Sequence, residues 1–114
     1  MELTVSHEQG YTLACTSGPI DDSASGPLRE LLHPLVAQKG TRLILDLSDS
    51  PRINSAGIGL LVKLVSDANS HASRVVLARV QPFVGEVLSV TRLNRFFEQA
   101  ETLSEAVTLA SAGK

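Results

Sequence analysis

The sequence predicts an α/β fold: a single domain in which four helices cover a mixed, mostly parallel sheet of about five strands. Three observations support this class. The chain has 114 residues, which is enough for one domain with a buried core but short for two. Apolar residues make up 43% and charged residues 19%, as in soluble globular proteins. β-prone runs alternate with runs of helical periodicity, which requires crossover helices between parallel strands.

The first part of the chain predicts a hairpin followed by a long helix. Residues 3–5 and 11–16 are β-prone runs separated by the turn-forming pair at 9–10, so they predict two antiparallel strands. Helical spacing of apolar residues then predicts a helix over 23–39. Its apolar stripe is Leu28, Leu31, Leu32, Leu35 and Val36. Pro34 lies inside this helix and lacks an amide donor, so we expect a kink or an early end there.

The rest of the chain predicts strands and helices in alternation. Strands are expected over 42–47, 74–78 and 96–97, and helices from about 54 to 72, over 82–91 and over 103–110. The inward positions of the helix near 54–72 are Ile58, Leu61, Val62, Val65, Ala68 and Ala72, and those of the next helix are Phe83, Val87 and Leu88. Residues 1–110 are expected to form the domain, and 111–114 a C-terminal tail.

Composition excludes several classes of function. The net charge is −2 and there is no basic run, so we do not expect a nucleic-acid partner. No apolar stretch approaches the roughly 20 residues of a membrane span, so we expect no membrane partner and a cytoplasmic location. The histidines His7, His33 and His71 lie in different elements without ligand spacing, so no metal site or cofactor is expected. The glycines at 57 and 59 lack the Lys-Ser/Thr of a phosphate loop, and close helix packing would explain them.

One segment carries a specific motif. Residues 45–48 read Leu-Asp-Leu-Ser, and residues 54–61 read Asn-Ser-Ala-Gly-Ile-Gly-Leu-Leu after a short loop. This pattern resembles the STAS domain family of sulfate transporters and anti-sigma-factor antagonists, whose motif is Leu-Asp-Leu-Ser, a loop, then Asp-Ser-Ser-Gly-Leu-Gly-Leu-Leu. The resemblance extends over nearly the whole chain, since residues 18–21 look like the Gly-x-Leu-Asp turn before the family's first helix.

The resemblance implies a phosphorylation switch at Ser55. In the antagonist branch, the serine at this motif position is phosphorylated by a cognate anti-sigma factor that is also a serine kinase. The unphosphorylated protein would bind that kinase, phosphorylation would release it, and a PP2C-type phosphatase would reset the switch. A helix N-terminus has free amide donors and a positive dipole end, so it tolerates a phosphate. Asn54 stands where the family usually has aspartate, and Ala56 where it often has a second serine.

Two alternatives to this function remain open. Ser55 is also a good N-cap residue, which would make it purely structural. The chain would then be a STAS subunit of another assembly, such as a stressosome or a lipid-transport ABC complex. An enzyme that uses Ser55 as a nucleophile is disfavoured, because no histidine or lysine base can be placed beside it from the sequence.

We expect the partner surface to surround Ser55. The residues assigned to partner binding are Asp21, Asn54, Ala56, Gly57, Leu60 and Leu64. Asp21 fits the family turn, although a cap or Asx turn before the first helix explains it equally well. Leu60 and Leu64 fall away from the apolar stripe of their helix and would form an exposed docking strip, unless Leu64 flanks the core.

Overall fold

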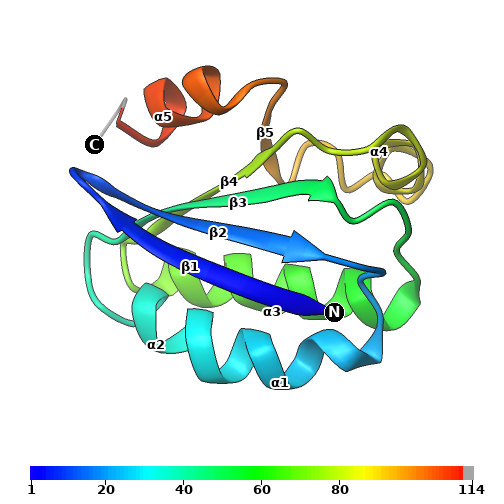
Figure 1. Ribbon diagram of the computed structural model, residues 1–114, viewed down its shortest axis with the longest axis horizontal. Coiled ribbons are helices and arrows are strands. Elements are labelled where there is room, and N and C mark those ends of the chain that lie inside the picture. Colours follow the sequence, from blue (N-terminus) through cyan, green and yellow to red (C-terminus); the bar gives the residue numbers. More distant parts are fainter. Residues whose placement is uncertain (112–114) are drawn as a thin grey trace.

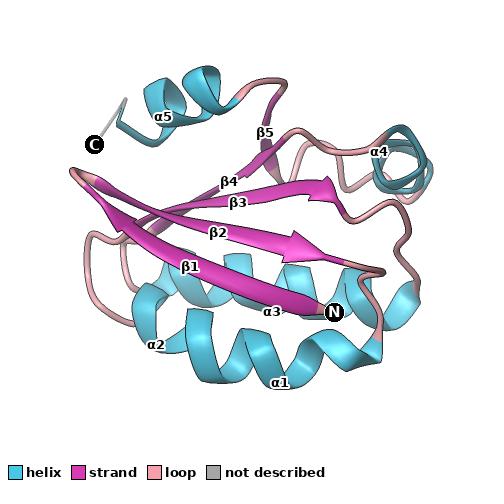
Figure 2. Cartoon of the chain, viewed as in Figure 1, coloured by secondary structure: helices cyan, strands magenta, loops and turns pink. Residues whose placement is uncertain are grey.

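A computed structural model describes residues 1–111 and confirms the predicted α/β class. Within these residues one sheet contains β1 (Glu2–Glu8), β2 (Tyr11–Ser17), β3 (Arg42–Asp49), β4 (Arg74–Ala78) and β5 (Glu98–Ala100). The helical elements are η1 (Asp22–Ala24), α1 (Ser25–Pro27), η2 (Leu28–Leu32), α2 (His33–Val36), α3 (Ser55–Ser70), α4 (Pro82–Val90) and α5 (Leu103–Ser111). Figures 1 and 2 show their arrangement. Ser111 thus ends α5, and the remaining residues of the expected tail lie outside the described part.

The strands lie side by side in the order β1-β2-β3-β4-β5. The pair β1 and β2 is antiparallel, and all other neighbours are parallel. Figure 1 shows α1, α2 and α3 together below the sheet and α5 above it. The hairpin and the crossover helices are therefore confirmed, and β3 is a central strand covered on both faces.

Two apolar clusters follow from the alternation of side chains along β3. Leu43, Leu45 and Leu47 are fully buried in the larger cluster, on the face covered by α1 to α3. Ile44 belongs to the smaller cluster under α5. Because successive strand residues point to opposite faces, one strand supplies both clusters. This explains why residues 43–45 of the strand are all apolar.

The first predicted helix is irregular. It consists of η1, α1, η2 and α2, where η2 is a π-helical segment in which the His33 amide bonds to the Leu28 carbonyl five residues back. Pro34 cannot donate to Glu30, and the wider turn relieves the clash of its ring with that carbonyl. The helix ends at Val36 and not at the expected Lys39. Leu31 is 44% exposed and lies off the buried stripe, contrary to prediction.

Two further predictions about element ends are wrong. The last strand is Glu98–Ala100, whereas Phe96 and Phe97 lie in the preceding turn. Phe97 is buried, and the two rings meet edge to face with their centroids 5.1 Å apart. Their high β-propensity reflects packing of the turn and not strand pairing. Ala72 lies beyond the end of α3, exposed and left-handed (φ 56°), so it cannot extend the buried stripe.

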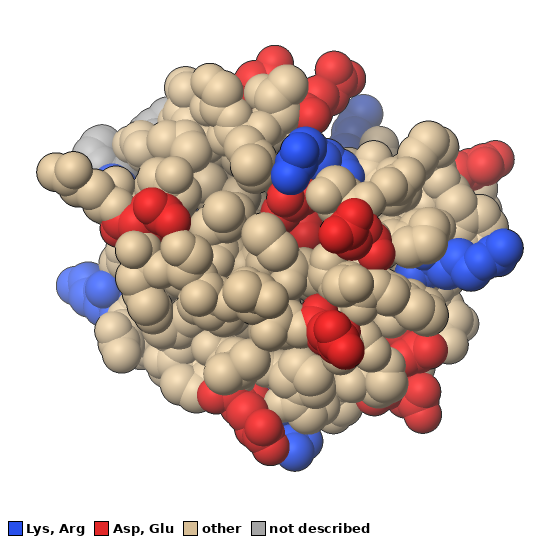
Figure 3. Space-filling view, viewed as in Figure 1, with Lys and Arg blue, Asp and Glu red and all other residues tan. Residues whose placement is uncertain are grey.

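Neither the charge distribution nor the helix lengths of the described residues set one part of the molecule apart. On the face in Figure 3, acidic and basic side chains are interspersed and form no single large patch of either sign. No helix within residues 1–111 combines the length and the apolar character needed to cross a bilayer.

Candidate functional site

The N-terminus of α3 is capped by Asn54. This residue has an extended backbone (φ −123°, ψ −175°), and its Oδ1 accepts a hydrogen bond of 2.9 Å from the Gly57 amide. That bond satisfies one of the free donors of the first turn. Asparagine is as good a cap as serine and comes one residue earlier, so the possible capping role of Ser55 is wrong.

Ser55 is the first residue of α3, and its side chain is exposed. The Ser55 hydroxyl makes no hydrogen bond with the residues that the structure describes. Ala56, the next residue, is also exposed. The hydroxyl at the start of α3 is therefore open to a partner or a modifying enzyme.

The turn between β2 and η1 is held tightly against the start of α3. An isolated parallel bridge joins Ile20 to Ile53, with the Ile20 amide bonded to the Arg52 carbonyl at 2.9 Å. The Asn54 amide donates to the Ile20 carbonyl at 3.2 Å. A Cβ atom on Gly57 would lie only 1.9 Å from the same carbonyl oxygen. The close packing expected for Gly57 is confirmed, and only glycine permits this approach. The same expectation for Gly59 is wrong, because Gly59 is exposed and no atom lies within 4 Å of an added Cβ.

Asp21 caps η1 and also lies beside the start of α3. Its carboxylate accepts hydrogen bonds from the Ser23 hydroxyl and from the Ser23 amide, which is 2.9 Å away. These two bonds, with the hydroxyl first, lower the pKa of Asp21 below its ordinary value. Asp21 and Asn54 line the same pocket. The capping role of Asp21 and its place near Ser55 are thus compatible.

That pocket brings together three segments at one edge of the sheet. Its volume is about 280 Å³, and its lining residues are Pro19, Ile20, Asp21, Arg52, Ile53, Asn54 and Phe83. The first three belong to the turn after β2, the next three to the loop after β3, and the last to α4. Figure 1 shows the turn, the loop and α4 together at the right-hand side of the molecule. In α/β folds, the carboxyl ends of parallel strands are the usual location of binding sites.

Phe83 is a functional candidate that the sequence analysis placed in the core. Its side chain is 47% exposed, whereas Val84 and Leu88 are fully buried and form the inward stripe of α4. The predicted inward positions Val87 and Leu88 are thus confirmed, with Val87 partly buried against the core, whereas Val84 takes the inward place predicted for Phe83. The Arg52 guanidinium lies over the Phe83 ring, 5.8 Å from its centroid. No periodicity indicates this pair, because it joins a loop residue to a distant helix.

The predicted docking strip on α3 is partly wrong. Leu64 is fully buried, so it cannot contact a partner. It is buried because α3 contacts the sheet together with α2 and η1, which widens its inward face. Leu60 is half-buried and lines a separate pocket of about 280 Å³ with Arg29 and Lys63. Leu60 therefore remains accessible as a single side chain.

The motif carboxylate Asp46 has a role that the sequence analysis did not assign. Asp46 is only 3% exposed on the α5 face of β3, and its Oδ2 pairs with Arg79 Nη2 at 2.5 Å. Burial tends to raise the pKa of Asp46, but hydrogen bonds from Arg79 and Ser48 outweigh burial and hold it below its ordinary value. This ion pair fixes the end of β4 against β3.

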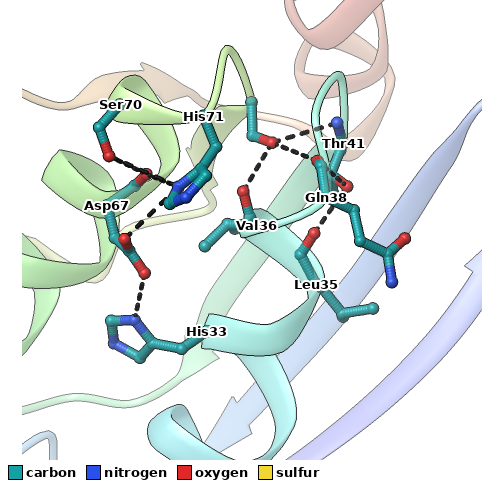
Figure 4. A network of polar contacts seen from close by, with 9 residues as sticks. His33, Leu35, Val36, Gln38, Thr41, Asp67, Ser70 and His71 are labelled. Carbon is teal, nitrogen blue, oxygen red and sulfur yellow. Dashed lines mark hydrogen bonds and ion pairs between the residues drawn. The ribbon is translucent and has the colours of Figure 1, made fainter.

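The histidines are engaged away from Ser55. His33 Nδ1 lies 2.8 Å from Asp67 Oδ2, and His71 Nδ1 lies 2.8 Å from the Asp67 carbonyl oxygen (Figure 4). The His33 bond is the main cause of the lowered pKa of Asp67. His7 approaches Thr12 on the hairpin. The Asp67 contacts join α2 to the C-terminal end of α3, the end opposite Ser55.

The fold and the motif around the exposed Ser55 define a small α/β domain of the STAS type. The STAS domain model matches residues 3–106, so the chain belongs to the STAS domain family. A Bordetella bronchiseptica protein, BtrV, named as an anti-sigma factor antagonist, is 26% identical over 106 residues, which are 93% of this chain and 91% of that protein.

Solved structures confirm the fold. The crystal structure of a Thermotoga maritima protein named as an anti-sigma factor antagonist matches with a TM-score of 0.80 at 20% identity. The match covers 95% of this chain and 93% of that protein's chain. The anti-sigma factor antagonist SpoIIAA, solved in its unphosphorylated form, has a TM-score of 0.71 at 15% identity and covers 99% of this chain and 100% of its own.

Proposed function

We propose that this protein is an anti-sigma factor antagonist that works by partner switching. The unphosphorylated form binds an anti-sigma factor that is also a serine kinase, and phosphorylation of Ser55 releases that partner. Membership of the STAS family and similarity to a relative named as an anti-sigma factor antagonist support this role. The role places the protein in the cytoplasm, where sigma factors act.

The observation that carries the proposal is the free Ser55 hydroxyl. Asn54 caps α3, so Ser55 can be modified without loss of the cap. In the kinase reaction, Ser55 Oγ forms a bond to the γ-phosphorus of ATP, the bond to ADP breaks, and the hydroxyl proton leaves. The product phosphate lies at the positive end of a 16-residue helix, which stabilises its charge. A PP2C-type phosphatase returns Ser55 to the hydroxyl and releases inorganic phosphate.

Release of the partner follows from the surroundings of Ser55. The phosphate adds about two negative charges and three acceptor oxygens. Ala56 follows Ser55 on the exposed start of α3, and Asp21 lines a pocket with the preceding Asn54, so a partner packed closely against these residues has no room for the new group. We assign partner contact to Asp21, Asn54, Ala56 and Leu60, while Gly57 acts by setting the distance between the turn and α3.

The direct test is phosphorylation by a cognate serine kinase, sought among the genes beside that of this protein. Purified protein is incubated with that kinase and ATP, and the phosphate is located by mass spectrometry. We expect one phosphate on Ser55 in the wild type and none in Ser55→Ala. Ser66→Ala, which removes an exposed serine further along the same helix, is the matched control and should be phosphorylated normally. A label that persists in Ser55→Ala, or never appears in the wild type, contradicts the proposal.

A pull-down separates this function from a subunit of a stressosome or of a lipid-transport ABC complex. The switch predicts that Ser55→Ala retains the kinase and that Ser55→Asp loses it. A structural subunit would hold its partners in both variants. Hydrolase substrates tested on the wild type and on Ser55→Ala address the other alternative, a Ser55 nucleophile.

A further inference from the structure

Arg52 carries a positive charge that no carboxylate neutralises in the described part of the chain. Its guanidinium lies 5.8 Å from the centroid of the Phe83 ring, and both side chains are exposed. The ion pairs among the described residues do not include Arg52. A cation on an exposed aromatic ring is held weakly, because water competes for the charge. Arg52 is therefore available to a stronger anionic partner.

The backbone fixes Arg52 at a short distance from Ser55. The Arg52 carbonyl accepts from the Ile20 amide at 2.9 Å, and the Asn54 amide donates to the Ile20 carbonyl at 3.2 Å. Three residues of extended chain span at most about 11 Å between Cα atoms. A long arginine side chain and a phosphoserine side chain together bridge such a distance. Arg52 also extends from the rim of the pocket that Asn54 lines.

We propose that phosphate on Ser55 draws the Arg52 guanidinium away from Phe83, so that Arg52 is the residue that transmits the modification to the partner surface. This inference rests on the proposed function, because it concerns the phosphorylated state of the same site. Arginine binds phosphate through two parallel charge-assisted hydrogen bonds, which are stronger than its contact with an exposed ring.

The rearrangement would change the pocket rim in two ways at once. The cation that faces a partner in the unphosphorylated protein becomes neutralised by the phosphate. The Phe83 ring, already 47% exposed, loses its cover. The switch thus alters the charge and the shape of the recognition surface without unfolding α3.

The test installs phosphoserine at position 55 during translation, so no kinase is needed. A ³¹P NMR titration from pH 5 to 8 then measures the second pKa of the phosphate, which is ordinarily about 6. We expect this pKa to be lower by about 0.8 unit or more with Arg52 than in Arg52→Gln, because the proposed contact places one positive charge about 4 Å from the phosphate even if water screens it fully. Lys39→Gln removes a charge beyond the opposite end of β3 and should leave the pKa as in the parent phosphoprotein.

A second measurement follows the ring contact itself. In the unphosphorylated protein, the Arg52 side-chain protons should show an upfield ring-current shift that disappears in Phe83→Leu. The same shift should disappear when residue 55 is phosphoserine. Backbone amide spectra of each variant verify that the fold is intact.

Two results would overturn the inference. One is an equal phosphate pKa in the Arg52→Gln and parent phosphoproteins, and the other is an unchanged Arg52 ring-current shift after phosphoserine is installed. These results do not depend on any kinase. Failure of the proposed function would appear separately, as an absence of Ser55 phosphorylation in the kinase assay while the Arg52 coupling is present.

Discussion

Gly57→Ala tests the contact that places Asp21 beside the start of α3. The new Cβ would lie 1.9 Å from the Ile20 carbonyl oxygen and 2.6 Å from its carbon, so the turn and the helix must separate by about 1.5 Å to reach an ordinary 3.4 Å contact. That movement would break the 3.2 Å hydrogen bond from the Asn54 amide. Overpacking costs about 1–3 kcal/mol and the lost bond about 1 kcal/mol, against a gain in helix propensity of at most about 1 kcal/mol.

The expected net effect is a loss of about 2 kcal/mol in the free energy of unfolding, or roughly 8 °C in Tm. Urea titrations followed by far-UV circular dichroism measure it. Gly59→Ala is the matched control on the same helix, because no atom lies within 4 Å of its added Cβ. It should stabilise the protein by up to about 1 kcal/mol. If Gly57→Ala is as stable as Gly59→Ala, the close approach of the turn to α3 is wrong.

Three further predictions concern the cap and the buried or bridging carboxylates. Asn54→Ala should lower the free energy of unfolding by about 1 kcal/mol in urea titrations, whereas Asn54→Asp should retain the cap; equal losses would contradict a capping role. Asp46 has a lowered pKa in the folded state, so its stabilisation is present above the unfolded value of about 3.9 and is lost as pH falls through the folded pKa. The urea midpoint should therefore fall more between pH 7 and pH 3 in the wild type than in Asp46→Asn. An equal decrease in both proteins would contradict this. Asp67→Asn should lower Tm at pH 7 by weakening the 2.8 Å contact of the carboxylate with His33, with a smaller difference at pH 3; a constant difference would rule out the carboxylate as the cause.

The sequence predicted the central strand and the Ser55 helix well because one physical pattern determines each. Residues 42–47 place apolar side chains on both faces, as a strand packed on both sides must, and they lie within β3. The Ser55 helix begins where a polar cap precedes apolar residues spaced by three and four. Its glycine at 57 was also correctly explained by close packing.

The features that the sequence did not predict depend on contacts between distant segments. Leu64 is buried because α3 packs against both the sheet and the α2 region, which a single helical stripe cannot indicate. The Arg52 and Phe83 pair joins residues 31 positions apart in the chain. The π-helical segment before Pro34 is one of several ways to accommodate a proline, and the sequence indicated only an irregularity.

The central claim is that the chemical state of Ser55 decides partner binding. The most direct measurement is the affinity of the kinase for this protein with serine or phosphoserine installed at position 55, determined by isothermal titration calorimetry at one salt concentration. The account predicts that phosphoserine weakens binding at least tenfold, or about 1.4 kcal/mol, with the fold unchanged. Equal affinity of the two forms would contradict it.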